Sequence, residues 1–333
     1  MKALTYSDVC LVPNLSELDS RSSCNASVEL FGARYKLPII PANMKAVISE
    51  EQCRWLAHNG YFYIMHRFDV DIVAFVDRAN RDEWPLVSIS LGVNAKDRDI
   101  LQRLKLSGAR GKVNFITLDI AHGHSLLMKE MLEACKSFSP ESILIAGNVA
   151  TPQGVTDLAT WGADMVKVGI GQGSPCTTKD KTGFTLPMFS CVKECSKVFV
   201  GDTFFNDNSN LDFSTPVPII ADGGVKCNGD IAKALVAGAK MVMAGGIFAC
   251  CSDSPAHAIE IDGTINKVYF GSASLENKKT KTHIEGLLKN VPTCGMNLKS
   301  KLQEIQEDIQ SSISYGGGKD LTCFENSVVY REL

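Results

Sequence analysis

Eight short apolar runs, rich in β-branched residues, recur along the chain with helix-like segments between them, and this repetition restricts the fold more than any other feature. The runs are Leu37–Ala42, Tyr61–Met65, Leu86–Leu91, Val113–Ile120, Ile143–Val149, Ala163–Ile170, Val217–Asp222 and Lys240–Gly245. Their hydrophobicity is continuous rather than alternating, which is typical of parallel strands buried on both faces. Eight strand–helix units with right-handed crossovers predict a closed (β/α)8 TIM barrel of the α/β class. A doubly wound open sheet is the structural alternative.

Four segments between or after these runs carry helix signals. Ser49–Asn59 begins with a serine cap and two acidic residues, and Thr151–Trp161 begins with a threonine cap followed by proline. Asn228–Ala237 ends at Gly238, a good C-terminal cap. Leu298–Ser312 has apolar residues at helical spacing and is expected to be the last barrel helix.

The runs show no domain boundary within Leu37–Phe248, so we expect a single barrel domain for the whole chain. A lead-in segment of about residues 1–36 precedes it. The polar, lysine-rich region Cys250–Val291 is expected to form a mobile loop, and we expect flexibility over about 271–297. Asp202–Thr215 reads as a surface insertion before the seventh strand.

The composition limits the kinds of partner that the chain can bind and the cellular compartment in which we expect it. The chain has 34 Lys+Arg against 37 Asp+Glu, a net charge of -3, which gives no electrostatic signature of nucleic-acid or membrane binding. No apolar run reaches the roughly 18–20 residues of a membrane span, and the N-terminus lacks a signal-peptide core. Twelve cysteines without a Cys-x-x-Cys pair indicate neither a disulfide scaffold nor a zinc site. We expect a soluble, cytoplasmic protein.

Glycine turns follow the last two expected strands. They are Asp222-Gly223-Gly224 after the seventh and Gly245-Gly246 after the eighth. In a barrel these turns form the usual phosphate position, because glycine lets backbone N–H groups approach an anion closely. Two tight strand–helix turns without a ligand are the alternative.

A glycine-rich loop, Gly169–Thr178, follows the sixth expected strand and contains a cysteine. It does not match the dinucleotide-binding pattern, because its third glycine is misplaced. A thiolate at Cys176 could attack an electrophilic carbon, with Thr178 passing a proton. An inert structural cysteine is the alternative.

Polar residues also stand at the ends of other strands. Asp119 could bind a ribose or an amide, with His122 and His124 as two general bases beside it. Alternatively, Asp119 ends a strand and the two histidines cover the surface of a loop. Asn43 and Asn148 are expected to be support residues.

Eight motifs in order along nearly the whole chain give it a resemblance to a known family. They are Tyr6–Pro13, Pro38–Met44, Tyr61–Phe68, Asp119–Ser125, Ile145–Val149, Val168–Thr178, Ile220–Gly224 and Gln310–Gly317. Together they resemble the IMP dehydrogenase/GMP reductase superfamily.

Three features resemble the short GMP reductase branch of that superfamily. The distance from Arg67 to Leu86 leaves no room for the regulatory tandem-CBS insertion of dehydrogenases. The stretch from Gly271 to Leu298 contains no arginine, although a dehydrogenase flap carries an Arg-Tyr pair, and Glu285 stands in a Glu-Gly setting. The resemblance implies NADPH-dependent reductive deamination of GMP to IMP and ammonia. An IMP dehydrogenase and a non-catalytic purine-nucleotide-binding relative are the alternatives.

The resemblance also implies roles for individual residues. Cys176 would attack C2 of the purine to give a covalent thioimidate, while Thr178 and Glu285 move protons. Carbonyl groups of Gly171, Gly173 and Cys176 would hold a monovalent cation, such as K⁺. The residues that would bind GMP are Asp222, Gly223, Gly224, Gly245, Gly246, Ser272, Ala273, Ser274, Thr282, His283, Ile284 and Gly286. Those that would bind NADPH are Arg67, Asp119, Ile120, Ala121, Ile170 and Gly171, with Ser20 and Arg21 from a neighbouring subunit of a homotetramer.

Four positions depart from the family pattern. Gln172 and Pro175 lie in the cysteine loop, and Pro175 stiffens the residue before the nucleophile. Thr282 stands where arginine is frequent, and Leu287 replaces a frequent lysine. None of the four is an expected catalytic residue.

Overall fold

The structure is a computed structural model, which describes residues 2–106, 112–199, 216–271, 274–278, 282 and 284–333. The expected insertion Asp202–Thr215 therefore lies outside the described residues. No helix in these ranges is long and apolar enough to cross a membrane.

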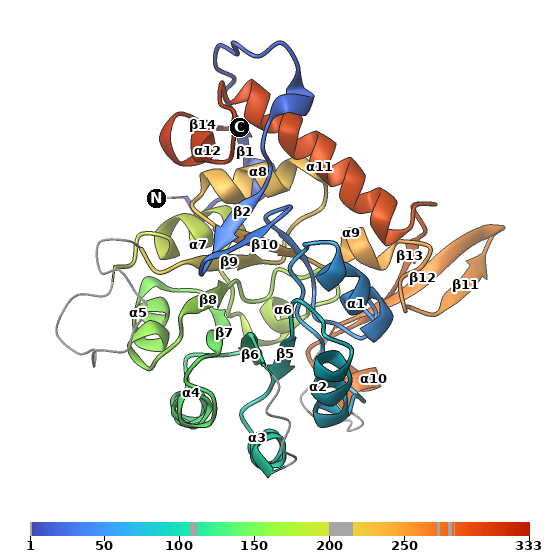
Figure 1. Ribbon diagram of the computed structural model, residues 1–333. Helices are drawn as coiled ribbons and strands as arrows, with labels where there is room; N and C mark the ends of the chain where they lie inside the picture. The colour runs from blue at the N-terminus through green and yellow to red at the C-terminus, as the bar shows by residue number, and fades with distance from the viewer. Residues whose placement is uncertain (1, 107–111, 200–215, 272–273, 279–281, 283) are drawn as a thin grey trace.

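A curved sheet of seven parallel strands occupies the centre of the molecule, with helices around it (Figure 1). Its order is β4-β10-β9-β8-β7-β6-β5, so the last strand along the chain pairs with the first. This curved parallel sheet with its surrounding helices confirms the expected α/β barrel. The strands are β4 (Ile39–Pro41), β5 (Ser88–Leu91), β6 (Phe115–Asp119), β7 (Ile143–Val149), β8 (Met165–Val168), β9 (Ile219–Asp222) and β10 (Met241–Ala244).

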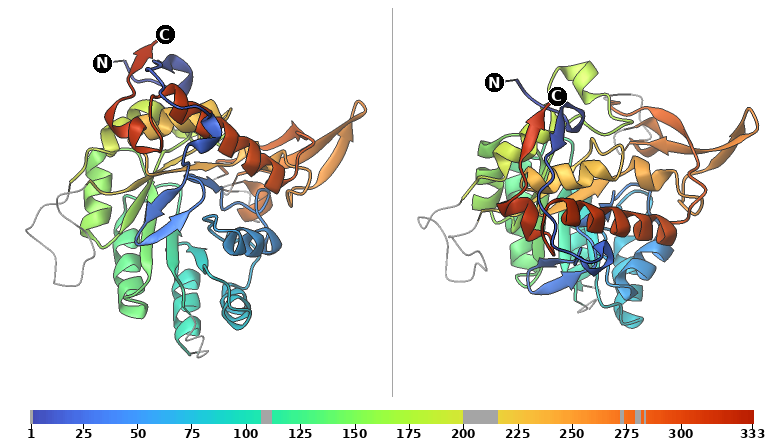
Figure 2. Two further views of the ribbon diagram at one scale, coloured as in Figure 1. Left: turned by 45° about the horizontal axis from the view of Figure 1, so that its top comes forward. Right: turned by 90° about the horizontal axis from the view of Figure 1, so that it is seen from above.

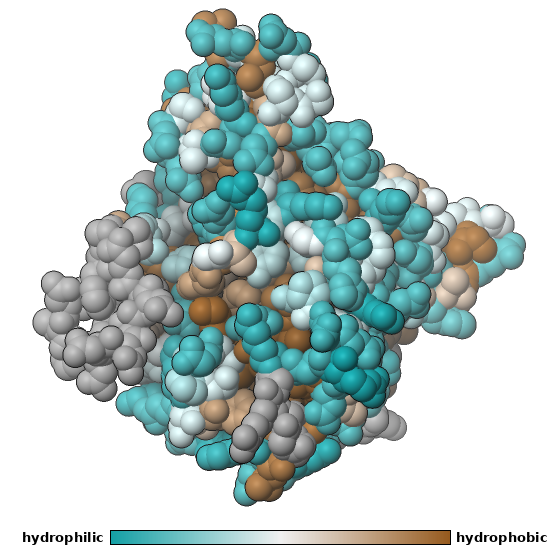
Figure 3. Space-filling view, viewed as in Figure 1, coloured by the Kyte–Doolittle hydropathy of each residue, from teal (hydrophilic) through white to brown (hydrophobic). Residues whose placement is uncertain are grey.

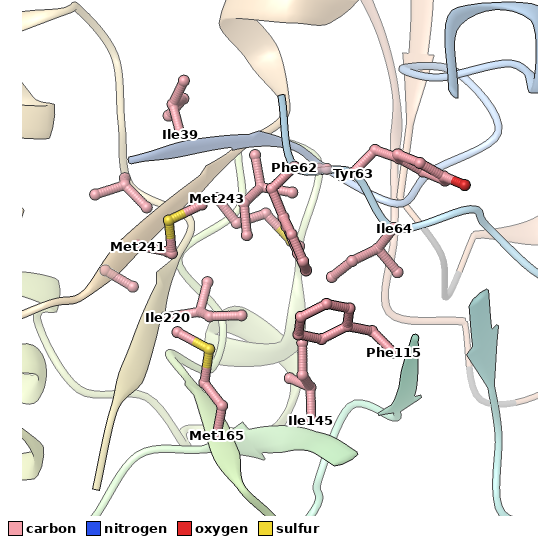
Figure 4. Packing of buried hydrophobic residues seen from close by; sticks show 14 of the residues in the cluster. Ile39, Phe62, Tyr63, Ile64, Phe115, Ile145, Met165, Ile220, Met241 and Met243 are labelled. Carbon is pink, nitrogen blue, oxygen red and sulfur yellow. The ribbon is translucent and has the colours of Figure 1, made fainter. Parts of the chain in front are cut away.

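The second apolar run, Tyr61–Met65, departs from the prediction of a full strand. In the described structure it joins the sheet through an isolated parallel bridge between Met65 and Ile89. Its side chains hold it in place instead: the Tyr63 hydroxyl donates to the carbonyl of Leu86 at 2.7 Å. Phe62 meets Phe115 edge-on, with ring centroids 4.8 Å apart (Figure 4). Buried aromatic packing thus replaces a backbone ladder at this position of the barrel.

Helices cover the outside of the barrel, and their ends follow the sequence signals. Ser49 caps α1 (Glu50–His58) in a reciprocal capping box, and Thr151 accepts a hydrogen bond from the amide of Gly154 at the start of α5 (Pro152–Thr160). The remaining helices that follow barrel strands are α2 (Ile72–Arg81), α3 (Ala95–Leu106), α4 (Leu126–Phe138), α6 (Thr178–Thr182), α7 (Met188–Cys195), α8 (Gly229–Val236) and α9 (Gly246–Ala249).

The barrel interior is filled by aliphatic and sulfur-containing side chains from successive strands. Figure 4 shows Ile145, Met165, Ile220 and Met241 converging there, whereas Ile39 points to the opposite face of the sheet, and all five are at most 1% exposed. This packing on both faces of the sheet explains the continuous hydrophobicity of the runs.

Segments from the two ends of the sequence pack together on one side of the barrel. β1 (Val9–Leu11) pairs antiparallel with β14 (Tyr330–Glu332), so the two ends lie side by side (Figure 2). The long helix α11 (Leu298–Tyr315) packs against α8 and η2. The other elements here are η1 (Tyr6–Asp8), η2 (Arg21–Ser23), β2 (Val28–Leu30), β3 (Ala33–Tyr35) and α12 (Thr322–Asn326).

The expectation of a loop over Cys250–Val291 is wrong for three strands within it. β11 (Ala258–Ile261), β12 (Thr264–Phe270) and β13 (Leu288–Pro292) form an antiparallel sheet that projects from the barrel (Figures 1 and 2), and α10 (Leu275–Lys278) lies between β12 and β13. We call these three strands the arm. β13 also falls inside the expected flexible stretch 271–297.

The arm has a turn signal that its polar composition obscured. Asp262 and Gly263 connect β11 to β12 with φ angles of 49° and 73°, as the two central residues of a tight hairpin require. Ile261 and Ile265 are exposed on this hairpin, and apolar colour is visible on the projection in Figure 3. Because the strands of the arm are largely exposed, their sequence resembles that of a loop.

Candidate active site

A cavity of about 430 Å³ lies at the C-terminal ends of the barrel strands. Most of the residues singled out in the sequence meet there, as the barrel architecture predicts. Those that line it are Cys176, Thr178, Glu285, Asp222, Gly223, Gly224, Gly245, Gly246, Arg67, Asp119, Ile120, Ala121, Ile170, Gly171 and Gly173.

The cysteine loop enters this cavity directly after β8. Gly169 has a φ of 125°, and a Cβ atom there would lie 2.3 Å from the carbonyl oxygen of Asp222, so only glycine allows the loop to leave the strand in this direction. The amide of Cys176 donates to the carbonyl of Gly173 at 2.9 Å. The turn places the Cys176 side chain at the cavity wall, half-buried.

Three side chains form a continuous hydrogen-bonded chain at this wall. The Cys176 thiol donates to Oγ1 of Thr178 at 3.2 Å, and the Thr178 hydroxyl donates to Oε2 of Glu285 at 2.5 Å. In both hydrogen bonds the donor lies on the Cys176 side and the acceptor on the Glu285 side. This arrangement can carry a proton from Cys176 to Glu285 without a change in backbone position.

Backbone pairing holds Glu285 in this chain. Cys176 and Gly286 form an isolated antiparallel bridge. The amide of Thr177 donates to the carbonyl of Glu285 at 2.9 Å, and the amide of Leu287 donates to the carbonyl of Pro175 at 2.8 Å. Since β13 begins at the next residue, the arm continues directly into the segment that supplies the carboxylate.

A cluster of charges lies at the cavity as well. Nζ of Lys167 is 2.9 Å from Oδ1 of Asp119 and 3.1 Å from Oδ2 of Asp222. We call these three residues the Asp–Lys–Asp cluster. The amide of Asn43 donates to Asp119 at 2.7 Å, and that of Asn148 donates to Asp222 at 2.8 Å, in agreement with their expected role as support residues.

Asp119 and Lys167 stabilise each other's charged forms. Burial acts to raise the pKa of Asp119, but the nearby Lys167 ammonium, hydrogen bonds from Lys167 and Asn43, and the charge of Arg67 outweigh it and hold the pKa below its usual value. Burial acts to lower the pKa of Lys167, but Asp119 and Asp222 raise it above its usual value. Asp119 and Lys167 therefore both favour their charged forms.

Sequence reasoning missed Lys167 and Tyr269, which also line the cavity. The available signal for Lys167 was a charged residue in the middle of the apolar run Ala163–Ile170. Tyr269 is buried on β12, and burial, Asp222 and Cys176 all raise the pKa of its hydroxyl. Nothing in the sequence distinguishes it from an ordinary strand tyrosine.

Several other expected residues take positions away from the cavity wall. Within the described ranges, neither His122 nor His124 lines the cavity, and His124 is 2.7 Å from Asp157. Ser20 and Arg21 are exposed beside α11, where the Arg21 guanidinium lies 5.0 Å from the centre of the Tyr315 ring.

The remaining expected contacts to GMP lie around the Glu285 segment. Ser274 is buried, Thr282 is exposed, and the carbonyl of Ile284 accepts a hydrogen bond from Lys181. Gly286 pairs with Cys176. Ser272, Ala273 and His283 lie outside the described residues.

A barrel with a relay of cysteine, threonine and glutamate at its strand ends is consistent with the family suggested by the motifs. The model of the "IMP dehydrogenase / GMP reductase domain" family matches residues 3–332. The chain belongs to this family.

Curated members of the IMP dehydrogenase/GMP reductase family align with almost the whole chain. A protein named GMP reductase from Acidovorax ebreus (strain TPSY) is 46% identical over 323 residues, which are 96% of this chain and 93% of that protein. Proteins of the same name from Leptothrix cholodnii and Staphylococcus carnosus (strain TM300) are each 44% identical over 324 residues, covering 97% and 96% of this chain and 94% of each relative.

Proposed function

We propose that this chain is a GMP reductase, which converts GMP and NADPH to IMP, ammonia and NADP⁺, and that residues 1–333 act as one catalytic barrel domain. The observation that carries the proposal is the hydrogen-bonded chain from Cys176 through Thr178 to Glu285 within a cavity at the strand ends. The absence of arginine from Gly271 to Leu298 argues against the dehydrogenase reaction, which needs a residue to activate water.

The relay supports a covalent route for the deamination. The Cys176 thiol passes its proton through Thr178 to Glu285, and the thiolate attacks C2 of the purine. The same relay returns a proton to the amino group, so that the C2–N bond breaks and ammonia leaves. The product is a thioimidate on Cys176. Division of the reaction through this adduct replaces one high barrier by two lower ones.

The two sides of the cavity suit the two ligands. Asp222 and the glycine turns at Gly223 and Gly245 would hold the ribose and phosphate of GMP, while Asp119 and Arg67 would face NADPH. Bound NADPH would supply the hydride that replaces the C2–S bond. Cys176 then leaves as a thiolate, ready for another cycle.

We assign a monovalent cation, such as K⁺, to the backbone of the cysteine loop. In the described part of the chain, side chains of His, Cys, Asp and Glu form no group of three or more that could hold a metal. A cation would therefore depend on the carbonyl oxygens of Gly171, Gly173 and Cys176. The Gly173 carbonyl already accepts one hydrogen bond, from the amide of Cys176, and retains a second lone pair.

We also propose that the active form is a homotetramer. Ser20, which caps η2, and Arg21, its first residue, are exposed, and in the described part of the chain neither lines the cavity of its own subunit. They could contact NADPH only if it were bound in a neighbouring subunit.

Absorbance at the NADPH band tests the proposed function directly. Purified protein should oxidise NADPH when GMP is added, and should not reduce NAD when IMP is added. Cys176→Ala should abolish NADPH oxidation while GMP still binds, and activity above about a thousandth of the wild-type value would exclude the covalent route. Binding of GMP without any NADPH oxidation in the wild-type protein would instead indicate a non-catalytic relative.

A further inference from the structure

A single buried ammonium joins two carboxylates that come from different parts of the barrel. Lys167 is on β8 and is 1% exposed, Asp119 ends β6, and Asp222 ends β9. Nζ of Lys167 lies 2.9 Å from one carboxylate and 3.1 Å from the other. All three residues of the cluster line the cavity.

Each carboxylate also has an amide of its own. Asn43 donates to Oδ2 of Asp119 at 2.7 Å, and Asn148 donates to Oδ2 of Asp222 at 2.8 Å. Asn148 also donates to the carbonyl of Gly169 at 2.8 Å. Lys167 is therefore the shared donor in a set whose other donors each serve one carboxylate.

Stability alone does not account for this arrangement. Removal of an ammonium and two carboxylates from water costs several kcal/mol per ion, and a well-packed apolar set of the same volume is often as stable. Without the ammonium, the two neighbouring carboxylates, which are only partly exposed, would repel each other. The cluster thus fixes the position of both acids.

We propose that Lys167 is a positioning residue, which aligns the GMP side and the NADPH side of the cavity by holding Asp222 and Asp119 to one ammonium. The inference rests on the proposed function, in which Asp222 faces GMP and Asp119 faces NADPH. Hydride transfer requires the two ligands to be held in register, because a misplacement of about 1 Å can cost about 10²-fold in rate. A common anchor for the two carboxylates therefore contributes to the rate.

Three variants distinguish a residue that positions both carboxylates from residues that position only one. Lys167→Met removes the ammonium and keeps an unbranched side chain, whereas Asn43→Ala and Asn148→Ala each remove a donor from one carboxylate. The quantities to measure are the Kd of GMP by equilibrium dialysis and the KM of NADPH at saturating GMP. Lys167→Met should raise both by about tenfold or more. Asn43→Ala should raise mainly the KM of NADPH, and Asn148→Ala mainly the Kd of GMP.

Two further variants keep the test decisive if Lys167→Met does not fold. Lys167→Arg retains the positive charge and should preserve more of both affinities than Lys167→Met. Lys167→Met combined with Asp119→Asn removes one negative charge together with the positive one, and should bind GMP nearly as well as the wild type while NADPH binding stays weak.

The inference is overturned if Lys167→Met leaves the Kd of GMP, the KM of NADPH or both unchanged. It is also overturned if Asn43→Ala and Asn148→Ala each raise both quantities as much as Lys167→Met does. Wild-type protein that does not oxidise NADPH with GMP would overturn the proposed function instead. Wild-type activity beside an unaffected Lys167→Met variant would overturn only the role of Lys167.

Discussion

Thr178 has a thiol on one side and a carboxylate on the other. A hydroxyl is a weak acid and a weak base, so alone it moves protons slowly, but a carboxylate within 2.5 Å can take or return its proton. Departure of ammonia needs a protonated nitrogen, whereas hydride transfer to or from C2 does not.

Glu285→Gln should therefore affect the two half-reactions differently. The amide is nearly isosteric but cannot relay a proton, so ammonia release should fall by about 10²-fold or more. The reverse hydride step, from IMP and NADP⁺ to the covalent adduct, should stay within about tenfold, or ~1.4 kcal/mol in barrier. Rapid-mixing measurement of NADPH formation beside steady-state ammonia release separates the steps. Equal loss in both would mean that Glu285 only holds the loop or the substrate.

His66 gives the fold a pH dependence of its own. Burial, with a smaller effect from Lys45, lowers the pKa of His66 to about 4. Between that value and the unfolded pKa of about 6.5, the unfolded chain binds a proton that the folded chain does not, so stability falls as the pH is lowered. From pH 7 to pH 5 the loss should be about 2 kcal/mol.

Urea unfolding of the wild type and His66→Gln at both pH values checks this expectation. Carboxylates elsewhere titrate in both proteins, so only the difference between them reports on His66. The stability advantage of the wild type should shrink by about 2 kcal/mol on acidification. A difference that does not change with pH would contradict the buried neutral imidazole.

At the scale of elements, backbone pairing joins the cysteine loop to the segment that carries Glu285, just before β13. A Cβ atom on Gly286 would lie 2.9 Å from the amide nitrogen of Ser274, which is backbone and cannot rotate away. Gly286→Ala should therefore displace the segment that carries Glu285. A shift of about 1 Å at the relay would reduce NADPH oxidation by about 10²-fold.

Gly229→Ala is the matched control for this substitution. Gly229 is the first residue of α8, with nothing within 4 Å of the position that a Cβ atom would take. Its activity should equal that of the wild type in the same NADPH assay, and its stability should not decrease. An active Gly286→Ala variant would show that the bridge to Cys176 is not needed to present Glu285.

The elements that sequence reasoning located best are those whose signal is local. The caps of α1 and α5 and the buried runs of β5 to β9 follow from residues close in the chain. Tyr61–Met65 was overestimated, because burial by aromatic packing looks the same in sequence as burial within a ladder. The arm was missed because its exposed antiparallel strands lack a continuous apolar run.

Site residues were predictable where they follow closely on the C-terminal end of an expected strand. Cys176, Thr178 and Asp222 stand at such ends and line the cavity. The pairing of Lys167 with Asp119 depends on how distant strands come together when the sheet curves, and no local pattern encodes it. The approach of Glu285 to Thr178 likewise depends on contact between the cysteine loop and the segment just before β13.

At the scale of the whole molecule, Arg21 is the residue whose proposed role a single subunit does not explain. It is exposed and lies over Tyr315 at the end of α11. If it reaches NADPH bound to a neighbour, Arg21→Ala should raise the KM of NADPH with little change in kcat, because such a contact is equal in ground and transition states.

Arg34→Ala provides the control, since Arg34 is also exposed and pairs with Glu29 on the surface. That variant should keep the wild-type KM, because an exposed ion pair contributes little. Sedimentation of the active enzyme should give a tetramer. A fully active monomer would exclude the contribution of Arg21 across subunits.

The pairing of β1 with β14 has a consequence for how the protein is made. Residues 9–11 emerge from the ribosome early, yet their hydrogen-bonding partners are residues 330–332. At about 5–20 residues per second, synthesis of the intervening chain takes roughly 15–60 s, and β1 stays without its partner strand throughout. β4 waits in the same way for β10, its partner in the central sheet. The nascent barrel is therefore an open sheet with an unpaired edge for most of translation, and such an edge makes the incomplete chain prone to aggregation.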